Sequence, residues 1–172
     1  TNRCIFHHAW DEVTTNCRGL ILNVDEETVV AACFPKFFSY ENHVQAGKPF
    51  PSEPPVVTEK LDGWYGSLYW LGGELWIATR GSFTSPGAVW ATAWMRVQYP
   101  LMDYATQEKL ADVGLTHLFE IISPVTHVVV RYGFSGLVHI GTLARETGRD
   151  VACILESMRR APEIRVEDYA CL

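Results

Sequence analysis

The first half of the chain alternates between short apolar runs and polar turns. Residues 17–24 and 29–34 form two strand-like runs, and the acidic turn 25–28 between them predicts a β-hairpin. Prolines interrupt the pattern after residue 34 and again across 49–55, which predicts an irregular surface connection.

The middle of the chain predicts a second pair of strands. The strand pattern resumes at Val56, and the runs 67–71 and 74–80 flank the dipeptide Gly72-Gly73. Two consecutive glycines are typical of a tight hairpin turn, because both positions need positive φ angles.

Helices and further strands follow. Predicted helices cover 86–97 and 101–113, predicted strands cover 117–122, 127–132 and 137–144, and a last helix covers 151–160. This order of elements predicts one domain over residues 1–172, with a mixed α/β fold of largely antiparallel sheets and flanking helices.

Composition and charge exclude several classes of protein. The chain has 172 residues, of which 48% are hydrophobic and 20% charged, as in ordinary globular proteins. It shows neither an apolar stretch of about 20 residues nor an apolar signal-peptide core, which predicts an intracellular, cytoplasmic protein without a membrane partner. The net charge of −6 argues against bulk electrostatic binding of nucleic acid. No cysteine or histidine spacing indicates a metal site.

The sharpest chemical signal is the segment 58–63, in which an apolar strand leads to Lys60 and an Asp-Gly turn. A lysine becomes a nucleophile only when its ammonium group loses a proton, which requires burial or nearby positive charge. Arg18, Lys36 or Arg80 could supply that charge. The alternative is a solvated surface lysine beside an ordinary turn.

Other candidates have weaker signals. Glu120 lies in an apolar run, where an unpaired carboxylate is costly, so it indicates a partner. Arg18 and Arg80 are also compatible with exposed strand ends. Among the aromatic residues, Trp70 is expected in the core, whereas Trp64 fits either the core or a base-stacking role.

Five short motifs occur in order along the chain, namely 17–20 (CRGL), 34–38 (FPKFF), 59–63 (EKLDG), 79–83 (TRGSF) and 118–124 (LFEIISP). Their order and spacing resemble the phage-type ATP-dependent RNA ligases of the covalent nucleotidyltransferase superfamily, over roughly residues 16 to 145. The K-x-D-G element is shared with DNA ligases and capping guanylyltransferases, which remain alternatives. The first two motifs favour the RNA ligases.

The resemblance implies a nucleotidyltransferase (ATP-grasp-like) adenylation domain that uses ATP and Mg²⁺. Lys60 matches the lysine that attacks the α-phosphate of ATP, forming lysyl-AMP and releasing pyrophosphate. Asp62 and Gly63 would shape its loop. Glu59 would lie near the adenine, and Glu120 near the ribose hydroxyls.

The remaining site residues follow from the same resemblance. Arg18 and Lys36 would cradle the phosphates, and Arg80 and Ser82 would lie close to the nucleotide. The implied partners are RNA ends, one with a 5′-phosphate and one with a 3′-hydroxyl. A non-catalytic nucleotide-binding or interaction module on the same scaffold is the alternative function.

The chain also departs from the family pattern. It contains neither the E-G-x-V strand, whose glutamate helps to hold a divalent metal, nor the K-x-K strand that contacts the α-phosphate, and no lysine follows Lys109. We therefore expect either an adenylyltransferase domain incomplete at its C-terminus, which we favour, or a degenerate relative. In both cases we expect this chain alone to self-adenylylate poorly.

Overall fold

The computed structural model describes residues 4, 6, 9–45, 47, 49, 52, 54, 56–126, 128–152, 155 and 158–163. A four-stranded antiparallel sheet, in the order β4-β3-β5-β6, forms its centre. The strands are β3 (Trp64–Leu71), β4 (Glu74–Thr79), β5 (Leu115–Ile122) and β6 (Gly136–Ala144). The expected mixed α/β fold with antiparallel sheets is therefore confirmed.

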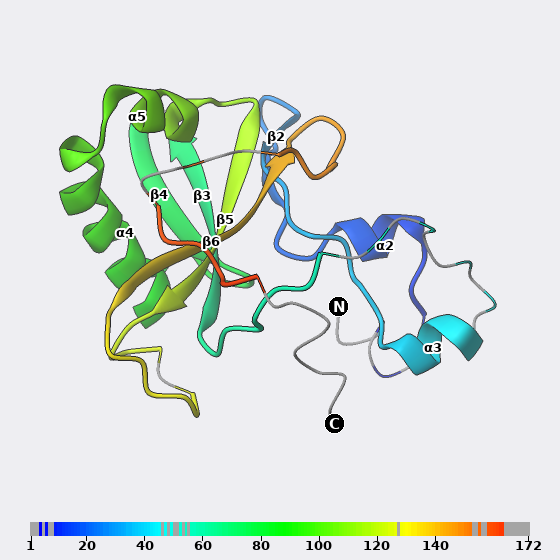
Figure 1. The fold of residues 1–172 in the computed structure, drawn as a ribbon. Helices are drawn as coiled ribbons and strands as arrows, with labels where there is room; N and C mark the ends of the chain where they lie inside the picture. The colour runs from blue at the N-terminus through cyan, green and yellow to red at the C-terminus, as the bar shows by residue number, and fades with distance from the viewer. Residues whose placement is uncertain are drawn as a thin grey trace.

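Two helices cover one face of this sheet (Figure 1). They are α4 (Pro86–Gln98) and α5 (Tyr104–Ala111), joined through the 3₁₀ turn Tyr99–Leu101. The Ser85 hydroxyl accepts a hydrogen bond from the backbone N–H of Ala88 and so caps α4. Both helices were predicted by the sequence, together with their interruption near Pro100.

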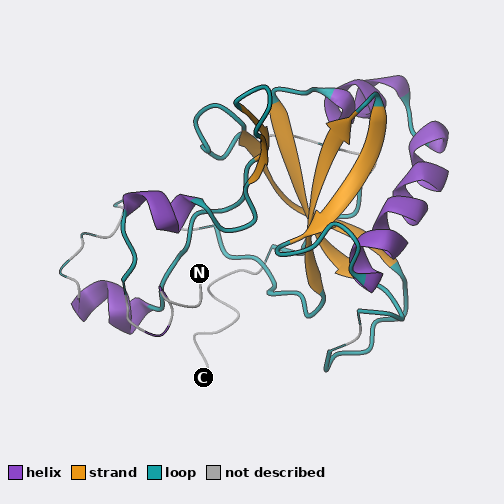
Figure 2. Cartoon of the chain, turned by 180° about the vertical axis from the view of Figure 1, so that it is seen from behind, coloured by secondary structure: helices purple, strands orange, loops and turns teal. Residues whose placement is uncertain are grey.

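The remaining elements lie on the other side of the sheet. Strands β1 (Ile21–Asn23) and β2 (Thr28–Ala31) form the predicted antiparallel hairpin. Helices α2 (Glu12–Asn16) and α3 (Tyr40–Gln45) were not predicted. Figure 2 shows that these two short helices lie in a part of the chain that projects away from the central sheet.

Strand alternation divides the sheet into two different faces. On the helix side, Leu68, Phe119 and Ile121 pack with Ala91 and Met95 of α4 in the main core. These five side chains are almost completely buried. The helix side therefore serves stability rather than chemistry.

The opposite face carries Glu120 together with Tyr65 and Ser67. Tyr65 pairs with Glu120 and Ser67 with Leu118 across β3 and β5, so these four side chains share one face. Ala32, which follows the hairpin, packs against Leu118 there. The hairpin thus covers one part of this face, and Glu120 lies near the border of the covered part.

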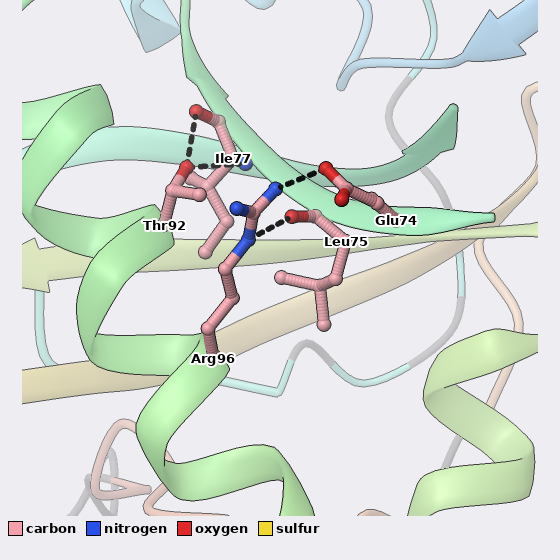
Figure 3. Close-up of polar contacts among 5 residues, drawn as sticks. All are labelled: Glu74, Leu75, Ile77, Thr92 and Arg96. Carbon is pink, nitrogen blue, oxygen red and sulfur yellow. Dashed lines mark hydrogen bonds and ion pairs between the residues drawn. The ribbon is translucent and has the colours of Figure 1, made fainter. Parts of the chain in front are cut away.

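Polar contacts fix α4 against the edge strand β4 (Figure 3). The Thr92 hydroxyl lies 2.9 Å from the Ile77 amide nitrogen and 3.3 Å from its carbonyl oxygen. The Arg96 guanidinium donates to the Leu75 carbonyl and to the Glu74 carboxylate, each at 3.0 Å. These contacts satisfy backbone groups at the sheet edge that would otherwise be open.

The strand expected from Val56 onwards is wrong up to residue 63. Residues 56–63 lie outside strands, apart from one bridge between Thr58 and Glu163, and β3 begins at Trp64. The backbone N–H of Glu59 donates instead to the carbonyl of Pro162, at 2.9 Å. Lys60 therefore lies in a loop before the strand.

Two later predictions are also wrong. His127 lies outside the described residues, and 128–132 form a loop because the Asp62 carboxylate takes the amides of Val129 and Val130. The described members of 151–160 are not helical. Residues 153, 154, 156 and 157 of that predicted helix lie outside the described residues.

Two buried histidines make stability depend on pH. A ring nitrogen of His117 and one of His139 each lie 3.0 Å from the Thr142 hydroxyl oxygen. Burial, with the nearby charges of His117 and Arg160, lowers the pKa of His139 to about 4. Between that value and the ordinary pKa of 6.5, the unfolded chain binds a proton that the folded chain does not bind.

We therefore expect stability to fall as the pH drops from 6.5 towards 4, by about 3 kcal/mol through this residue. Urea unfolding of the wild type and of His139→Gln at several pH values measures the effect. Between pH 6.5 and pH 4, His139→Gln should lose about 3 kcal/mol less stability than the wild type loses. The control variant His43→Gln should lose as much stability as the wild type. Parallel pH profiles for wild type and His139→Gln would contradict this account.

Candidate functional site

The loop that carries Lys60 is fixed to β5 by a glycine. The backbone N–H of Gly63 donates to the Glu120 carboxylate at 2.8 Å. A Cβ atom on Gly63 would lie 2.5 Å from the Ile121 carbonyl oxygen, so a larger residue does not fit without displacing the backbone. The glycine of the K-x-D-G motif thus allows the loop to approach the sheet closely.

Asp62 connects the same loop to the loop after β5. One carboxylate oxygen of Asp62 accepts hydrogen bonds from the amides of Val129 and Val130, both at 2.7 Å. The Asp62 amide donates to the Tyr132 hydroxyl at 2.8 Å. Three hydrogen bonds therefore join segments that are far apart in the sequence.

Glu120 and Lys60 interact electrostatically at this position. Burial raises the pKa of Glu120, the Gly63 amide and the Lys60 ammonium lower it, and the Asp62 charge raises it, with a net upward shift. Lys60 is exposed and Glu120 half-buried. The arrangement places a lysine that is open to solvent beside a carboxylate in a less polar setting.

A second group of cations surrounds Cys33 on the same face of the sheet. Burial raises the pKa of the Cys33 thiol, and the positive charges of Arg18 and Arg80 act in the opposite direction. Gly19, which has a φ of 73°, lies against Cys33 and the backbone of Arg80. The CRGL and TRGSF motifs are therefore neighbours in space.

Tyr65 lies between the two groups. Its ring is opposite Glu120 across the strands, and its hydroxyl and the Cys33 thiol influence each other's pKa. Burial raises the pKa of Tyr65, and the Cys33 and Ser67 side chains lie close enough to its hydroxyl to influence that pKa.

Lys36 belongs to the second group. Burial and the charge of Arg18 lower the pKa of Lys36. Its ammonium group lies 4.4 Å from the centre of the Phe38 ring and donates to the Phe37 carbonyl oxygen. The cation is thus close to Arg18 but held by its own FPKFF motif.

Glu59 and Ser82 have less direct positions. Glu59 is exposed and lines a cavity of about 470 Å³ with Leu61 and Tyr132. The Ser82 hydroxyl accepts from the Thr84 amide at 3.1 Å and belongs to the turn after β4. Among the contacts of the described residues, none joins Ser82 to the Lys60 loop.

The predicted residues therefore form two adjoining groups. The first contains Lys60, Glu59, Asp62, Gly63 and Glu120, and the second contains Arg18, Lys36 and Arg80.

The sequence interpretation missed three residues of this site, which are Cys33, Tyr65 and Tyr132. Alternation along β3 could have placed Tyr65 on the face of the site, because it follows the Asp-Gly turn by two residues. Cys33 and Tyr132 depend on contacts between distant segments, for which the sequence has no local signal.

The described residues contain no cluster of three or more His, Cys, Asp or Glu side chains able to hold a metal ion. In the same part of the chain, no helix is long and apolar enough to cross a membrane.

Comparisons with known proteins identify the family of this chain. The RNA ligase family model matches residues 16–153. RNA ligase 1 of Bacteriophage TS2126 is 32% identical over 127 residues, which cover 70% of this chain and 32% of that protein. A putative bifunctional polynucleotide kinase/RNA ligase of Autographa californica nuclear polyhedrosis virus is 30% identical over 159 residues, covering 82% of this chain and 23% of that protein.

A solved structure has a similar fold. An archaeal ATP-dependent RNA ligase matches 86% of this chain and 41% of its own, with a TM-score of 0.55 and 18% identity. The fold is thus similar to that of RNA ligase adenylation domains. The chain belongs to the RNA ligase family, a family of ATP-dependent nucleotidyltransferases. It spans about a third or less of the length of the curated relatives described above.

Proposed function

We propose that this chain is part of a single adenylyltransferase domain of an ATP-dependent RNA ligase, and that Lys60 accepts AMP. The observation that carries the proposal is the Lys60 loop, in which Gly63 donates to Glu120 and the Lys60 charge acts on that carboxylate. This geometry holds the Lys60 loop against β5. Family membership supplies the reaction.

In the first step, the neutral amine of Lys60 attacks the α-phosphorus of ATP. A phosphorus–nitrogen bond forms, the bond to the bridging oxygen breaks, pyrophosphate leaves, and the lysine proton passes to solvent. Negative charge spreads over the phosphate oxygens, so nearby cations stabilise the transition state. Arg18, Arg80 and Lys36 are the cations available for this role.

In the second step, an oxygen of the RNA 5′-phosphate attacks the phosphorus of lysyl-AMP. The phosphorus–nitrogen bond breaks, Lys60 recovers its proton, and a 5′–5′ pyrophosphate links AMP to the RNA. In a third step, a 3′-hydroxyl attacks the RNA phosphorus, its proton passes to solvent, AMP leaves, and a phosphodiester bond joins the strands. Glu59 and Glu120 would contact the adenine and the ribose, whereas Arg80 and Ser82 would lie near the nucleotide.

The Mg²⁺ ion does not fit as a resident metal of the described residues, because they contain no cluster of ligands for it. Mg²⁺ commonly binds through substrate phosphates and one or two carboxylates. We therefore expect it to arrive with ATP, and we assign it no step of its own.

Labelling tests this function directly. The chain is incubated with ATP labelled at the α-phosphate, with labelled GTP as the control, and is then separated on a denaturing gel. We expect slow, acid-labile labelling from ATP, and transfer of the label to RNA with a 5′-phosphate but not to RNA with a 5′-hydroxyl. The absence of protein label, or equal label from GTP, would contradict the proposal.

Replacing Glu120 with glutamine should raise stability and weaken ATP binding. Burial raises the pKa of Glu120 in the folded chain, so ionisation of this carboxyl group destabilises the fold. The free energy of unfolding therefore falls as the pH rises above 4.5, the ordinary pKa of glutamate. The variant should melt about 1–3 °C higher at pH 7. Half-maximal labelling should need about tenfold more ATP, because a charged hydrogen bond to the ribose is lost.

Thermal melts at pH 5 and pH 7, together with ATP titrations of labelling, measure both effects. A variant with a lower melting temperature and unchanged ATP dependence would contradict the position assigned to Glu120.

A further inference from the structure

An aromatic pair stands beside the Lys60 loop. The rings of Tyr132 and Phe134 meet edge to face, with centroids 5.7 Å apart. The Arg159 guanidinium lies 3.7 Å from the centroid of the Phe134 ring. Because the Asp62 amide donates to the Tyr132 hydroxyl, this pair is fixed to the loop of the proposed nucleophile.

Three cavities adjoin at Phe134. Their volumes are about 230, 390 and 470 Å³, and Phe134 lines all of them. Arg131 lines the first, Arg159 the second and third, and Arg160 the third. Together they extend from the loop after β5 to the end of α4.

The three arginines are exposed and locally concentrated in a chain with a net charge of −6. The ion pair found in the described part of the chain joins Arg96 to Glu74, so within that part no carboxylate lies at ion-pair distance from Arg131, Arg159 or Arg160. One acidic side chain lines each cavity, namely Asp62 in the first, Asp103 in the second and Glu59 in the third.

We propose that this rim, defined as Arg131, Tyr132, Phe134, Arg159 and Arg160, binds the single-stranded RNA next to the 5′-phosphate that receives AMP. The inference rests on the proposed function and adds the position of its second substrate.

The chemistry of the rim matches such a strand. Bases of single-stranded RNA stack on aromatic rings and on arginine guanidinium planes. The Arg159–Phe134 pair offers such a plane already held in place, and Arg131 and Arg160 can bind phosphate oxygens in a bidentate way. The adjoining Lys60 loop would then face the end of the strand.

Binding of a fluorescent 5′-phosphorylated single-stranded RNA to the chain tests the rim without requiring catalysis. Arg159→Ala and Phe134→Leu should each weaken binding about tenfold, the usual loss for one stacked base. Arg131→Ala should lower the slope of log Kd against log salt by about 0.7, as expected for one lost phosphate contact. Arg159→Lys keeps the positive charge but loses the guanidinium plane. It should therefore keep the slope of log Kd against log salt and lose affinity for the RNA.

Arg149→Ala is the matched control, because it removes an exposed arginine beyond the far end of β6. It should bind RNA within about twofold of the wild type. Arg131 is exposed, so its variant tests the rim even if Phe134→Leu fails to fold. Circular dichroism checks the fold of each variant.

ATP labelling of Lys60 separates this proposal from a rim that serves ATP. The labelling rates of the rim variants should stay within about twofold of the wild-type rate. Their loss of RNA affinity should be at least about fivefold larger than any loss of labelling rate. Unchanged RNA affinity, or a loss of labelling as large as the loss of RNA binding, would overturn the rim assignment. If the wild type itself takes no label, the proposed function fails, and the RNA titration still decides whether the rim binds a strand.

Discussion

Replacing Lys60 with alanine is expected to abolish the covalent AMP label completely. The guanidinium groups of Arg18 and Arg80 do not act as nucleophiles. The Lys36 ammonium is held against the Phe38 ring. No other amine with a comparable position lies in the described part of the chain, so the loss should be total rather than partial.

Lys109→Ala provides the control for this experiment, because it removes the same charge from α5 on the helix side of the sheet. It should label like the wild type. Acid-labile label on Lys60→Ala at the wild-type level would show that another residue accepts the AMP.

Gly63→Ala is expected to have the second largest effect. A Cβ atom there would lie 2.5 Å from the Ile121 carbonyl oxygen and 2.9 Å from Cδ1 of Ile122. The loop must then move away from β5, and the hydrogen bond from Gly63 to Glu120 is lost. We expect a loss of about 1–3 kcal/mol in the free energy of unfolding. The labelling rate should fall by about a hundredfold, because a displacement of about 1 Å is enough for such a loss.

Gly133→Ala is the matched control, since nothing lies within 4 Å of a Cβ atom at that position. Urea unfolding and initial labelling rates compare the two variants. Equal rates for Gly63→Ala and the wild type would show that close approach of this loop to β5 is not needed for the reaction.

The sequence predicted those elements whose signals are local. The Gly72-Gly73 turn fixes the β3–β4 hairpin, because both glycines adopt positive φ angles of 62° and 78°. The start of α4 at Pro86 is equally local, since proline is favoured in the first turn of a helix. Such signals need no knowledge of the rest of the fold.

The failed predictions have a common physical cause. The run of three valines in 128–130 has a high strand propensity, yet the Asp62 carboxylate binds the amides of Val129 and Val130. Propensity is a weak preference that a distant partner overrides. Glu59 likewise directs its amide to Pro162 rather than to a neighbouring strand of the sheet.

The candidate site also contains residues with a local sequence signal and residues without one. The motifs that carry Lys60, Gly63 and Glu120 were found in the sequence, and the structure brings these three residues together. The role of Tyr132 depends on a contact across 70 residues of sequence. The sequence motifs therefore named three residues that lie together, but not the residue of the distant loop that contacts them.

The position of the AMP group tests the central claim most directly. After incubation with ATP, the wild-type chain is digested and its peptides are sequenced by mass spectrometry under non-acidic conditions that preserve the phosphoramidate. The account predicts one adenylylated residue, Lys60, in the peptide that contains Asp62 and Gly63. An adenylyl group on Lys36, Lys48 or Lys109 with none on Lys60 would contradict it.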